Sequence, residues 1–495
     1  MNVLLAGPIL IPLFGAALSI GLGRSRTAQR LVGVVTLLTV AVMSVVLLVR
    51  VDDDGTASVQ AGGWEAPVGI TLVSDRLAAI MLVVGLLMLL AVLVYAIGQP
   101  GAERDHVGFH PVYLILAAGV SAAFLTGDLF NLFVSFEVML MASYVLITLG
   151  GRPEQVRTGM TYVVISLLAS TLFLLTLGFV YAATGTVNLA DLSSKIPDLP
   201  AGVRSGLALL LIVVFGIKAA IFPLFFWLPD SYPTAPTPVT AVFAGLLTKV
   251  GVYALIRTQT LLFPTDTRPG TLLLVVAALT MVVGVLGAIA QNDMKRILSF
   301  HIVSQIGYMI MGLGLFTAAG LAGAVIYIVH HIVVKTTLFL VTGLVEQRRG
   351  TGQLATLSGL ARLQPLLAVM FLLPALSLAG IPPFSGFVAK LALVESGIEA
   401  EAYAVVAISL AVSLLTLFSM TKIWANAFWG SPDEAPPETR QPQRAKDALM
   451  VAATASLVVL SLVIAAGSGP LFELSQRAAG DLVDPSAYVE AVLQP

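Results

Sequence analysis

The chain contains no cysteine, and charged residues make up only 11% of its 495 residues. Without thiols it can form no disulfide, bind no iron–sulfur cluster through thiolates and use no cysteine nucleophile. His and acidic residues are scattered and lack the spacing of a zinc site. The net charge is −1 and no long basic run occurs, which argues against a nucleic-acid partner. We therefore expect no cofactor and no metal site, and any redox chemistry would take place on a partner.

Hydrophobic residues make up 58% of the chain, too many for a soluble globular protein. A membrane-spanning helix needs about 20 apolar residues, whereas strands of a membrane barrel alternate with period two over about ten. The sequence therefore predicts an all-α polytopic membrane protein of fourteen transmembrane helices. The apolar stretches lie near residues 3–22, 31–49, 77–97, 111–127, 129–149, 159–183, 205–229, 237–257, 271–290, 297–316, 319–345, 365–394, 403–425 and 447–467.

The cations between the stretches predict how the chain is oriented. No basic segment precedes the first stretch, so a cleaved signal peptide is not expected. With the N-terminus outside, the inner loops hold about fourteen Lys and Arg, Arg24, Arg104 and Arg440 among them, and the outer loops about seven, including Arg257. Such an excess is typical of cytoplasmic loops. An even number of spans then places both termini outside, with acidic clusters at 52–54 and 395–401 in outer loops.

Five lysines and one carboxylate remain inside predicted spans, where each charge costs about 2.5 to 3.5 kcal/mol even on the lenient insertion scale. Lys422 lies close to a span end, so we interpret it as a side chain that reaches the interface. The deeper charges are candidates for function, namely Glu137, Lys218, Lys249, Lys335 and Lys390. For Glu137 we favour a charge pair with a lysine of another helix over a neutral side chain that only packs. Asp128, by contrast, is interpreted as a helix N-cap.

Two adjacent histidines, His330 and His331, precede Lys335 in one span. Residues 331 and 335 stand one helical turn apart on the same face, and such a ladder can pass protons. A lone buried histidine is usually structural, but two beside an intramembrane lysine favour a functional role. His301 is a weaker candidate.

Prolines interrupt two spans beside a lysine. Pro223 follows Lys218, and Pro382 and Pro383 precede Lys390. Proline removes a backbone hydrogen bond, which is tolerated at membrane depth where the freed carbonyls line a wet cavity, and broken helices beside buried charges are typical of transporters. The breaks fall in the seventh and twelfth spans, which predicts two inverted five-helix repeats, spans 4–8 and 9–13. The expected divisions are 1–110 for the first three helices, 111–260 and 261–430 for the repeats, and 431–495 for a loop, a last helix and an outer tail.

Six segments resemble the antiporter-like membrane subunits shared by respiratory complex I and the Mrp-type multisubunit sodium/proton antiporters. Complex I subunits typically carry histidines where this sequence has Phe225 and SYPTAP, after Asp230, so the resemblance favours the Mrp branch and its D-type subunits, as does the length. The resembling segments are FVSFEVM at Glu137, KAAIFPLFFWLPDSYPTAPTPVTA from Lys218, GLLTKVGVY around Lys249, NDMKRILSFHIVSQIGY, HHIVVKTTLFLVTG and GIPPFSGFVAK ending at Lys390.

The resemblance implies a horizontal polar axis that maps to Glu137, Lys218, Lys249, His330, His331, Lys335 and Lys390. It further implies proton transport coupled to Na⁺ in a bacterial cell membrane, by a chain assembled with other hydrophobic subunits, including a longer antiporter-like one. As a hypothesis, the carboxylate keeps Lys218 charged, and its withdrawal lets Lys218 release a proton. The surplus of lysines repels cations, so Na⁺ is expected to pass elsewhere.

Three alternatives remain on the sequence alone. A proton-pumping subunit of a complex I or membrane-hydrogenase type redox complex would have cofactor-bearing partners. A non-transporting scaffold would make the buried charges dispensable. A single-chain permease for organic solutes is compatible with hydropathy, although no substrate pocket is evident.

Overall fold

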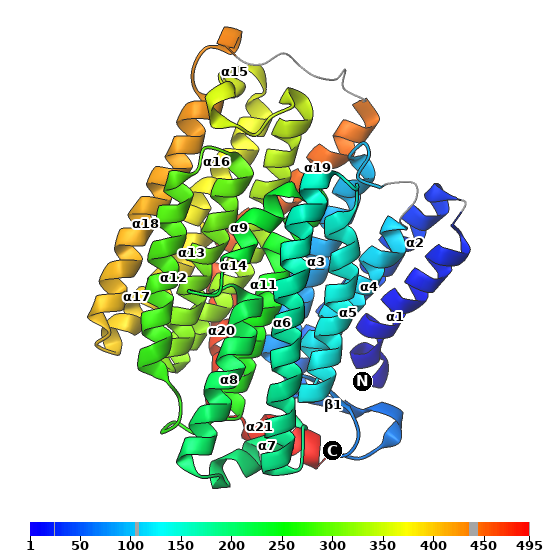
Figure 1. Cartoon of the computed structure of the whole chain (residues 1–495), viewed down its shortest axis with the longest axis vertical. Coiled ribbons are helices and arrows are strands. Elements are labelled where there is room, and N and C mark those ends of the chain that lie inside the picture. The colour runs from blue at the N-terminus through cyan, green and yellow to red at the C-terminus, as the bar shows by residue number, and fades with distance from the viewer. Residues whose placement is uncertain (24, 104–107, 435–443, 495) are drawn as a thin grey trace.

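A computed structural model of the chain describes residues 1–23, 25–103, 108–434 and 444–494; Arg24, Arg104 and Arg440, counted above for the orientation, lie outside the described residues. The helices form one bundle, and both termini lie at the same end of it (Figure 1). Twelve described helices are long and apolar enough to cross a membrane, and two shorter apolar helices accompany them. These fourteen correspond to the predicted spans, which confirms the all-α membrane fold.

The helix and strand bounds follow in chain order, with the 3-10 turns of three residues omitted: α1 Asn2–Gly21, α2 Arg26–Asp54, β1 Ala57–Gln60, β2 Thr71–Ser74, α3 Arg76–Gly98, α4 Phe109–Leu125, α5 Leu129–Thr148, α6 Pro153–Thr184, α7 Leu189–Lys195, α8 Ala201–Ala219, α9 Trp227–Ser231, α10 Thr237–Val242, the π-helical turn Phe243–Leu247, α11 Thr248–Leu261, α12 Gly270–Ala290, α13 Met294–Leu315, α14 Ala318–Arg349, α15 Leu360–Leu363, α16 Pro365–Ala379, α17 Ser385–Glu399, α18 Tyr403–Ile423, the π-helical turn Trp424–Phe428, α19 Arg444–Ala466, α20 Ser468–Val483 and α21 Ser486–Leu493.

Three sequence expectations need correction at the ends of spans. Residues 52–54 form the last turn of α2, and Glu395 and Glu399 belong to α17, so these acidic side chains do not lie in loops. Arg257, assigned above to an outer loop, is a buried residue of α11. Polar turns continue these helices beyond the apolar stretch, because hydropathy marks the part of a helix in lipid and not its full length.

The face of the bundle that carries both termini, called the terminal face below, also carries a small antiparallel hairpin. Strand β1 pairs with β2 with Ala57 opposite Ser74. The C-terminal helix α21 packs on this hairpin: Ser58 Oγ donates to the carbonyl of Ala491 at 2.6 Å, and Gln60 Nε2 to that of Val492 at 3.2 Å. The last helix of the chain is therefore fixed to its first hairpin.

Two matching connections reveal the internal repeat. Around Asp128, which caps α5, the N–H of Leu129 donates to Val187 and that of Leu189 to Gly127. Around Asp293, which caps α13, Met294 donates to Gly352 and Leu354 to Asn292 in the same way. The first connection leads to α7 at the terminal face and the second to α15 at the opposite face (Figure 1). The second unit is thus inverted relative to the first, as predicted; Asp128 is the predicted N-cap.

Both predicted helix breaks are present, but proline does not end the helices. Ala220 caps the end of α8 and Gly380 caps the end of α16. Both residues have the left-handed conformation, with φ of 62° and 85°. In both, the next residue, Ile221 or Ile381, donates back to a carbonyl of the last turn. This cap terminates a helix by itself. Proline follows three residues later, at Pro223 and Pro383, and prevents the helix from resuming at once.

Helix α14 occupies the centre of the bundle and contacts α3, α13, α16, α17, α19 and α20. Its residues 320–345 are all buried. A helix that is apolar on every side belongs in a core. The polar side chains of α14, His330, His331 and Lys335 among them, therefore lie in the interior of the bundle, away from lipid.

Candidate functional site

Glu137 of α5 and Lys218 of α8 are joined through a serine of α6. Ser170 Oγ donates to Oε1 of Glu137, and Lys218 Nζ donates to Ser170 Oγ at 3.0 Å. In the part of the chain that the structure describes, the two charged groups form no direct ion pair. The predicted pair is therefore mediated by a hydroxyl group, which can both accept and donate a proton.

The surroundings of Lys218 combine burial with a little free space. The side chain is 8% exposed, its Nζ also lies 3.4 Å from the carbonyl of Ser166, and it stands 5.6 Å from the centre of the Phe136 ring. A cavity of about 20 Å³ borders it, lined by Tyr162, Ser166 and Trp227 among others. That volume accommodates about one water molecule. Lys218 thus has room to exchange its proton with water.

Lys249 lies directly after the π-helical turn between α10 and α11. Its Nζ donates to the carbonyl of Ala244, inside that turn, at 2.5 Å, and to Thr248 Oγ1 at 3.2 Å. A π turn leaves a carbonyl without its usual helical partner, and such turns are frequent at functional sites. Gly245 allows the turn to approach α14, because a Cβ there would lie 2.1 Å from Thr336 Oγ1. The turn therefore both binds the lysine and brings it to α14.

The α14 cluster, His331 and Lys335, is fully buried. Within the described residues, the two ring nitrogens of His331 have no hydrogen-bond partner, and Nζ of Lys335 has none either. Electrostatic interactions connect Lys335 with Lys249, and His331 with both lysines. Buried polar atoms require hydrogen-bond partners. Where several neighbouring polar atoms have no partner in the protein, ordered water molecules bind to them.

His330 leads from α14 to the second helix break. Its Nδ1 lies 2.9 Å from Ser385 Oγ, and Ser385 Oγ lies 3.3 Å from Ser377 Oγ. Ser377 belongs to the last turn of α16 and Ser385 begins α17. The histidine therefore contacts the α17 side of the break directly and is linked to the α16 side through Ser385.

Lys390 of α17 binds the carbonyls that the end of α16 leaves free. Its Nζ donates to Leu378 and Ala379, both at 3.1 Å, and to Ser413 Oγ at 2.9 Å. It also stands 5.0 Å from the centre of the Tyr308 ring. Among the described residues, no carboxylate lies within 4 Å of Lys249, Lys335 or Lys390. The second half of the axis is thus basic throughout.

His301 of α13, the weaker candidate, lies beside this axis. Its Nε2 is 2.9 Å from Ser419 Oγ, and it interacts electrostatically with Lys335 and Lys390. The structure therefore brings His301 into the neighbourhood of the predicted set without inserting it between two members.

Lys422 has a structural environment. Its Nζ donates to the carbonyls of Ile289 and Gln291 and to Asn292 Oδ1, at 3.0, 2.7 and 2.9 Å. Ile289 lies in the last turn of α12, and Gln291 and Asn292 follow that turn, where carbonyls lack helical partners. Lys422 thus caps α12 and remains partly exposed.

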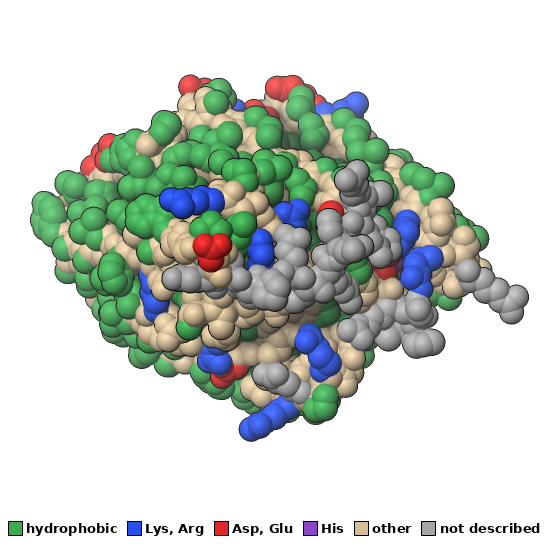
Figure 2. Space-filling model, turned by 90° about the horizontal axis from the view of Figure 1, so that it is seen from above, with side chains coloured by type: hydrophobic (Ala, Val, Ile, Leu, Met, Phe, Trp, Pro, Cys, Tyr) green, Lys and Arg blue, Asp and Glu red, His purple; other side chains and the backbone are tan. Residues whose placement is uncertain are grey.

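A large polar pocket of about 710 Å³ opens between the two repeats on the face opposite the termini. Figure 2 shows this face, with Lys and Arg side chains distributed over it. Inside the pocket Lys295 pairs with Glu346 at 2.6 Å and Arg296 with Asp230 at 2.9 Å. Arg157 of α6 also lines it.

Sequence reasoning missed the hydroxyl groups that connect the charges. Thr158, Tyr162, Ser166 and Ser170 follow one another at intervals of four along α6 and lead from the polar pocket to Glu137. Such spacing places side chains on one helix face, and it is visible in the sequence. Single serines and threonines are too common in membrane helices to stand out.

Comparisons with known proteins show the family to which the chain belongs. Residues 126–416 match the family model described as NADH:quinone oxidoreductase/Mrp antiporter, TM. The chain belongs to this family. It is 45% identical to the D-type subunit of a Na⁺/H⁺ antiporter of Alkalihalophilus pseudofirmus and 38% identical to that of Bacillus subtilis, with all of both chains covered in each case.

Solved structures give the same result. The chain matches the Mrp complex of a Dietzia species with a TM-score of 0.92 and 35% identity over all of both chains. It also matches an archaeal membrane-bound sulfane sulfur reductase, with a TM-score of 0.90, 26% identity and 99% of both chains covered. Membership of the antiporter-like family, and of its Mrp branch, is thereby confirmed.

Proposed function

We propose that this chain is the proton-translocating D-type subunit of a multisubunit Na⁺/H⁺ antiporter and that it acts as a transporter subunit, not as an enzyme. The observation that carries the proposal is the row of buried ionisable groups from Glu137 to Lys390, connected by hydroxyl groups, water-sized space and two helix breaks. Intramembrane ionisable groups in such an arrangement are typical of proton relays. The D-type relatives add the identity of the exchanged ion.

Proton entry is proposed from the polar pocket. The ladder of Thr158, Tyr162, Ser166 and Ser170 leads from it to the mediated pair. A proton reaching Lys218 forms the ammonium, which the carboxylate of Glu137 stabilises through Ser170. When the carboxylate moves away, the apolar surroundings favour the neutral amine, and the proton passes to water on the side of Lys249.

The second half of the axis then carries the proton by the same exchange. Lys249, the α14 cluster, His330 and Lys390 each accept a proton and release it to the next group. Because neighbouring cations repel one another, a proton arriving at one group favours release from the next. Na⁺ finds no carboxylate near these lysines among the described residues, so we place its path in a partner subunit or at an interface.

We further propose that the terminal face is outside the cell. The basic side chains of the opposite face in Figure 2 fit the cytoplasmic side of a bacterial plasma membrane. Other hydrophobic subunits, including a longer antiporter-like one, are the proposed partners.

The test uses the whole complex in everted membrane vesicles, with Na⁺-driven proton flux followed by a pH-sensitive dye. Glu137→Gln and Lys218→Ala should each abolish exchange, while Lys195→Ala, at an exposed ion pair of α7, should leave it unchanged. Complex assembly is verified by affinity purification of the tagged chain. Normal exchange by Glu137→Gln or by Lys218→Ala would contradict a role of the Glu137–Lys218 pair in transport. Co-purification of iron–sulfur subunits would instead favour the redox-driven pump.

A further inference from the structure

A buried ion pair closes the bundle at the terminal face, below the polar axis. Arg257 of α11 binds both carboxylate oxygens of Asp75 at 2.6 Å, and the two residues are 4% and 1% exposed. Asp75 also caps α3 by accepting from the N–H of Ala78 at 2.9 Å. A buried ion pair rarely stabilises a fold more than apolar residues of the same size. Its presence therefore requires another reason.

The pair lies on the same helix face as Lys249. Residues 249, 253 and 257 follow at intervals of four along α11, so that Tyr253 stands one turn from each charge. The Tyr253 hydroxyl donates to the carbonyl of Phe124 at 2.8 Å. Arg257 Nη2 lies 3.5 Å from the same hydroxyl. Polar groups thus run from the middle of the bundle to its terminal face.

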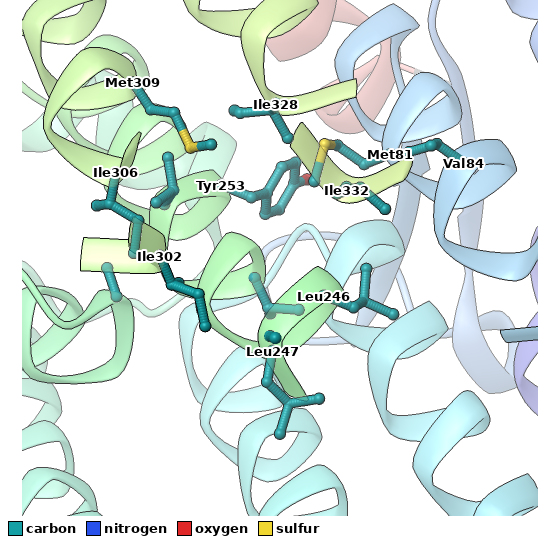
Figure 3. Close-up of a cluster of buried hydrophobic side chains, with 14 of the residues drawn as sticks. Met81, Val84, Leu246, Leu247, Tyr253, Ile302, Ile306, Met309, Ile328 and Ile332 are labelled. Carbon is teal, nitrogen blue, oxygen red and sulfur yellow. The ribbon is translucent and has the colours of Figure 1, made fainter. Parts of the chain in front are cut away.

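On the side of α3 and α14, the ring of Tyr253 packs against apolar side chains. Figure 3 shows its ring among Met81 of α3 and Ile328 and Ile332 of α14. All three aliphatic side chains are fully buried. Tyr253 is the one polar side chain among those labelled in Figure 3, so within this layer its hydroxyl is the group that can hydrogen-bond a water molecule. The Tyr253 hydroxyl is therefore placed to let a proton cross this layer.

The C-terminal segment covers the outer side of the pair. The ring of Tyr488, from α21, lies 5.1 Å from the guanidinium of Arg257 and is buried. Asp481 of α20 binds Arg76 at 2.9 Å, and Arg76 binds Asp52 at 2.8 Å. Tyr488 and Asp481 both belong to the last two helices of the chain, so a movement of this one short segment removes the cover from the pair.

We propose that Tyr253, Arg257 and Asp75 form a proton exit from Lys249 to the terminal face, which α20 and α21 close. When the segment moves away, the Lys249 ammonium gives its proton to water hydrogen-bonded to Tyr253, the neutral amine remains, and the proton leaves past Arg257 as hydronium. This inference rests on the proposed function, since it gives the same relay a second outlet, at Lys249, beside its continuation to Lys390.

The first experiment measures passive leak, which needs no exchange activity. In vesicles that contain the assembled complex, Asp75→Asn should make an imposed pH gradient decay several-fold faster. Arg204→Gln, at the exposed Arg204–Asp266 pair, is the matched control and should not. The swap of Asp75→Arg with Arg257→Asp restores a pair and should remove the leak. Absence of leak in an assembled Asp75→Asn complex would overturn the gate.

The second experiment locks the segment, and the cysteine-free chain provides a clean background. The variant carries Ser58→Cys and Ala491→Cys, at two residues that are in contact between β1 and α21. Oxidation joins the two cysteines in a disulfide, and loss of maleimide labelling verifies that it has formed. Exchange should stop after oxidation and return after reduction, whereas each single cysteine should be insensitive. Full exchange by the locked protein would overturn the exit. If the double-cysteine variant shows no exchange after reduction while the Asp75→Asn complex still leaks protons, the proposed function is wrong, and the closure of the exit by Asp75 and Arg257 is still supported.

Discussion

Lys218 reaches Glu137 only through the hydroxyl of Ser170, which donates to the carboxylate and accepts from the ammonium at 3.0 Å. Both charges are therefore held by one rotatable group. Rotation of this hydroxyl suffices to break the link without moving a helix. The serine is thus the element of the pair most suited to switching.

Ser170→Ala should lower Na⁺-driven proton flux strongly while the complex still assembles, because the carboxylate then no longer communicates with the lysine. The measurement is dye-monitored exchange in everted vesicles. Thr171→Ala is the matched control on the same helix, since the Thr171 hydroxyl donates to the carbonyl of Leu167 in α6 itself, at 2.9 Å. Equal flux in the two variants would show that the hydroxyl link has no role.

The close approach of the π turn to α14 gives a second prediction. Gly245→Ala places a methyl group 2.1 Å from Thr336 Oγ1, which forces α14 away. Overpacking of this kind costs about 1–3 kcal/mol. We expect a lower unfolding temperature of the purified complex together with slower exchange, because Lys335 moves with α14. The added Thr336→Ala substitution removes the clashing atom and should recover both properties; failure to recover them would contradict the packing argument.

The charges of the axis can be predicted from the sequence because a lysine in lipid is costly whatever surrounds it. The helix breaks are indicated by Pro223 and Pro383, yet the structure assigns the ends to Ala220 and Gly380, whose left-handed conformation no apolar pattern reveals. Ser170 cannot be distinguished from other helical serines in the sequence. Its role arises from the distance between α6 and α8, which only the packed bundle defines.

The terminal face shows the same limit. Arg257 follows one apolar stretch and Asp75 precedes another, so in the sequence each alone looks solvent-exposed. Their pairing joins residues 182 positions apart. Such a bidentate contact can be recognised only when the tertiary structure is known. The internal repeat, by contrast, is predictable from the spacing of two proline breaks, and the matching connections at Asp128 and Asp293 confirm it.

Acid should weaken the packing of α2 against the start of α4. Glu103, in the connection before α4, accepts from Arg30 Nε at 2.9 Å and lies 2.7 Å from His110 Nε2. Burial alone would raise the pKa of Glu103, but the hydrogen bonds from Arg30 and His110 outweigh it and lower this pKa below its ordinary value. A carboxyl group with a lowered pKa stabilises the folded state above its unfolded pKa and loses that contribution as the pH falls through the folded value.

Thermal unfolding of the complex at a series of acidic pH values tests this. The unfolding temperature of the wild type should fall as the pH drops below the ordinary pKa of glutamate. The Glu103→Gln variant should have a lower unfolding temperature at neutral pH, and this temperature should change less as the pH falls. Asp53, an acidic residue of α2 without such partners among the described contacts, provides the control Asp53→Asn. Parallel curves for wild type and Glu103→Gln would exclude Glu103 as the source of the acid dependence.

Lys422→Ala should separate a structural lysine from the transporting ones. The variant removes three hydrogen bonds to groups at the end of α12, and bonds from a charged donor contribute about 1.5–3 kcal/mol each at most, less where water can replace them. We expect a lower unfolding temperature with exchange per assembled complex retained, whereas Lys390→Ala should abolish exchange. Lys422→Arg should recover stability, because the guanidinium donates to the same carbonyls. Complete loss of exchange in an assembled Lys422→Ala complex would place Lys422 on the proton path and extend the axis to the boundary of the bundle.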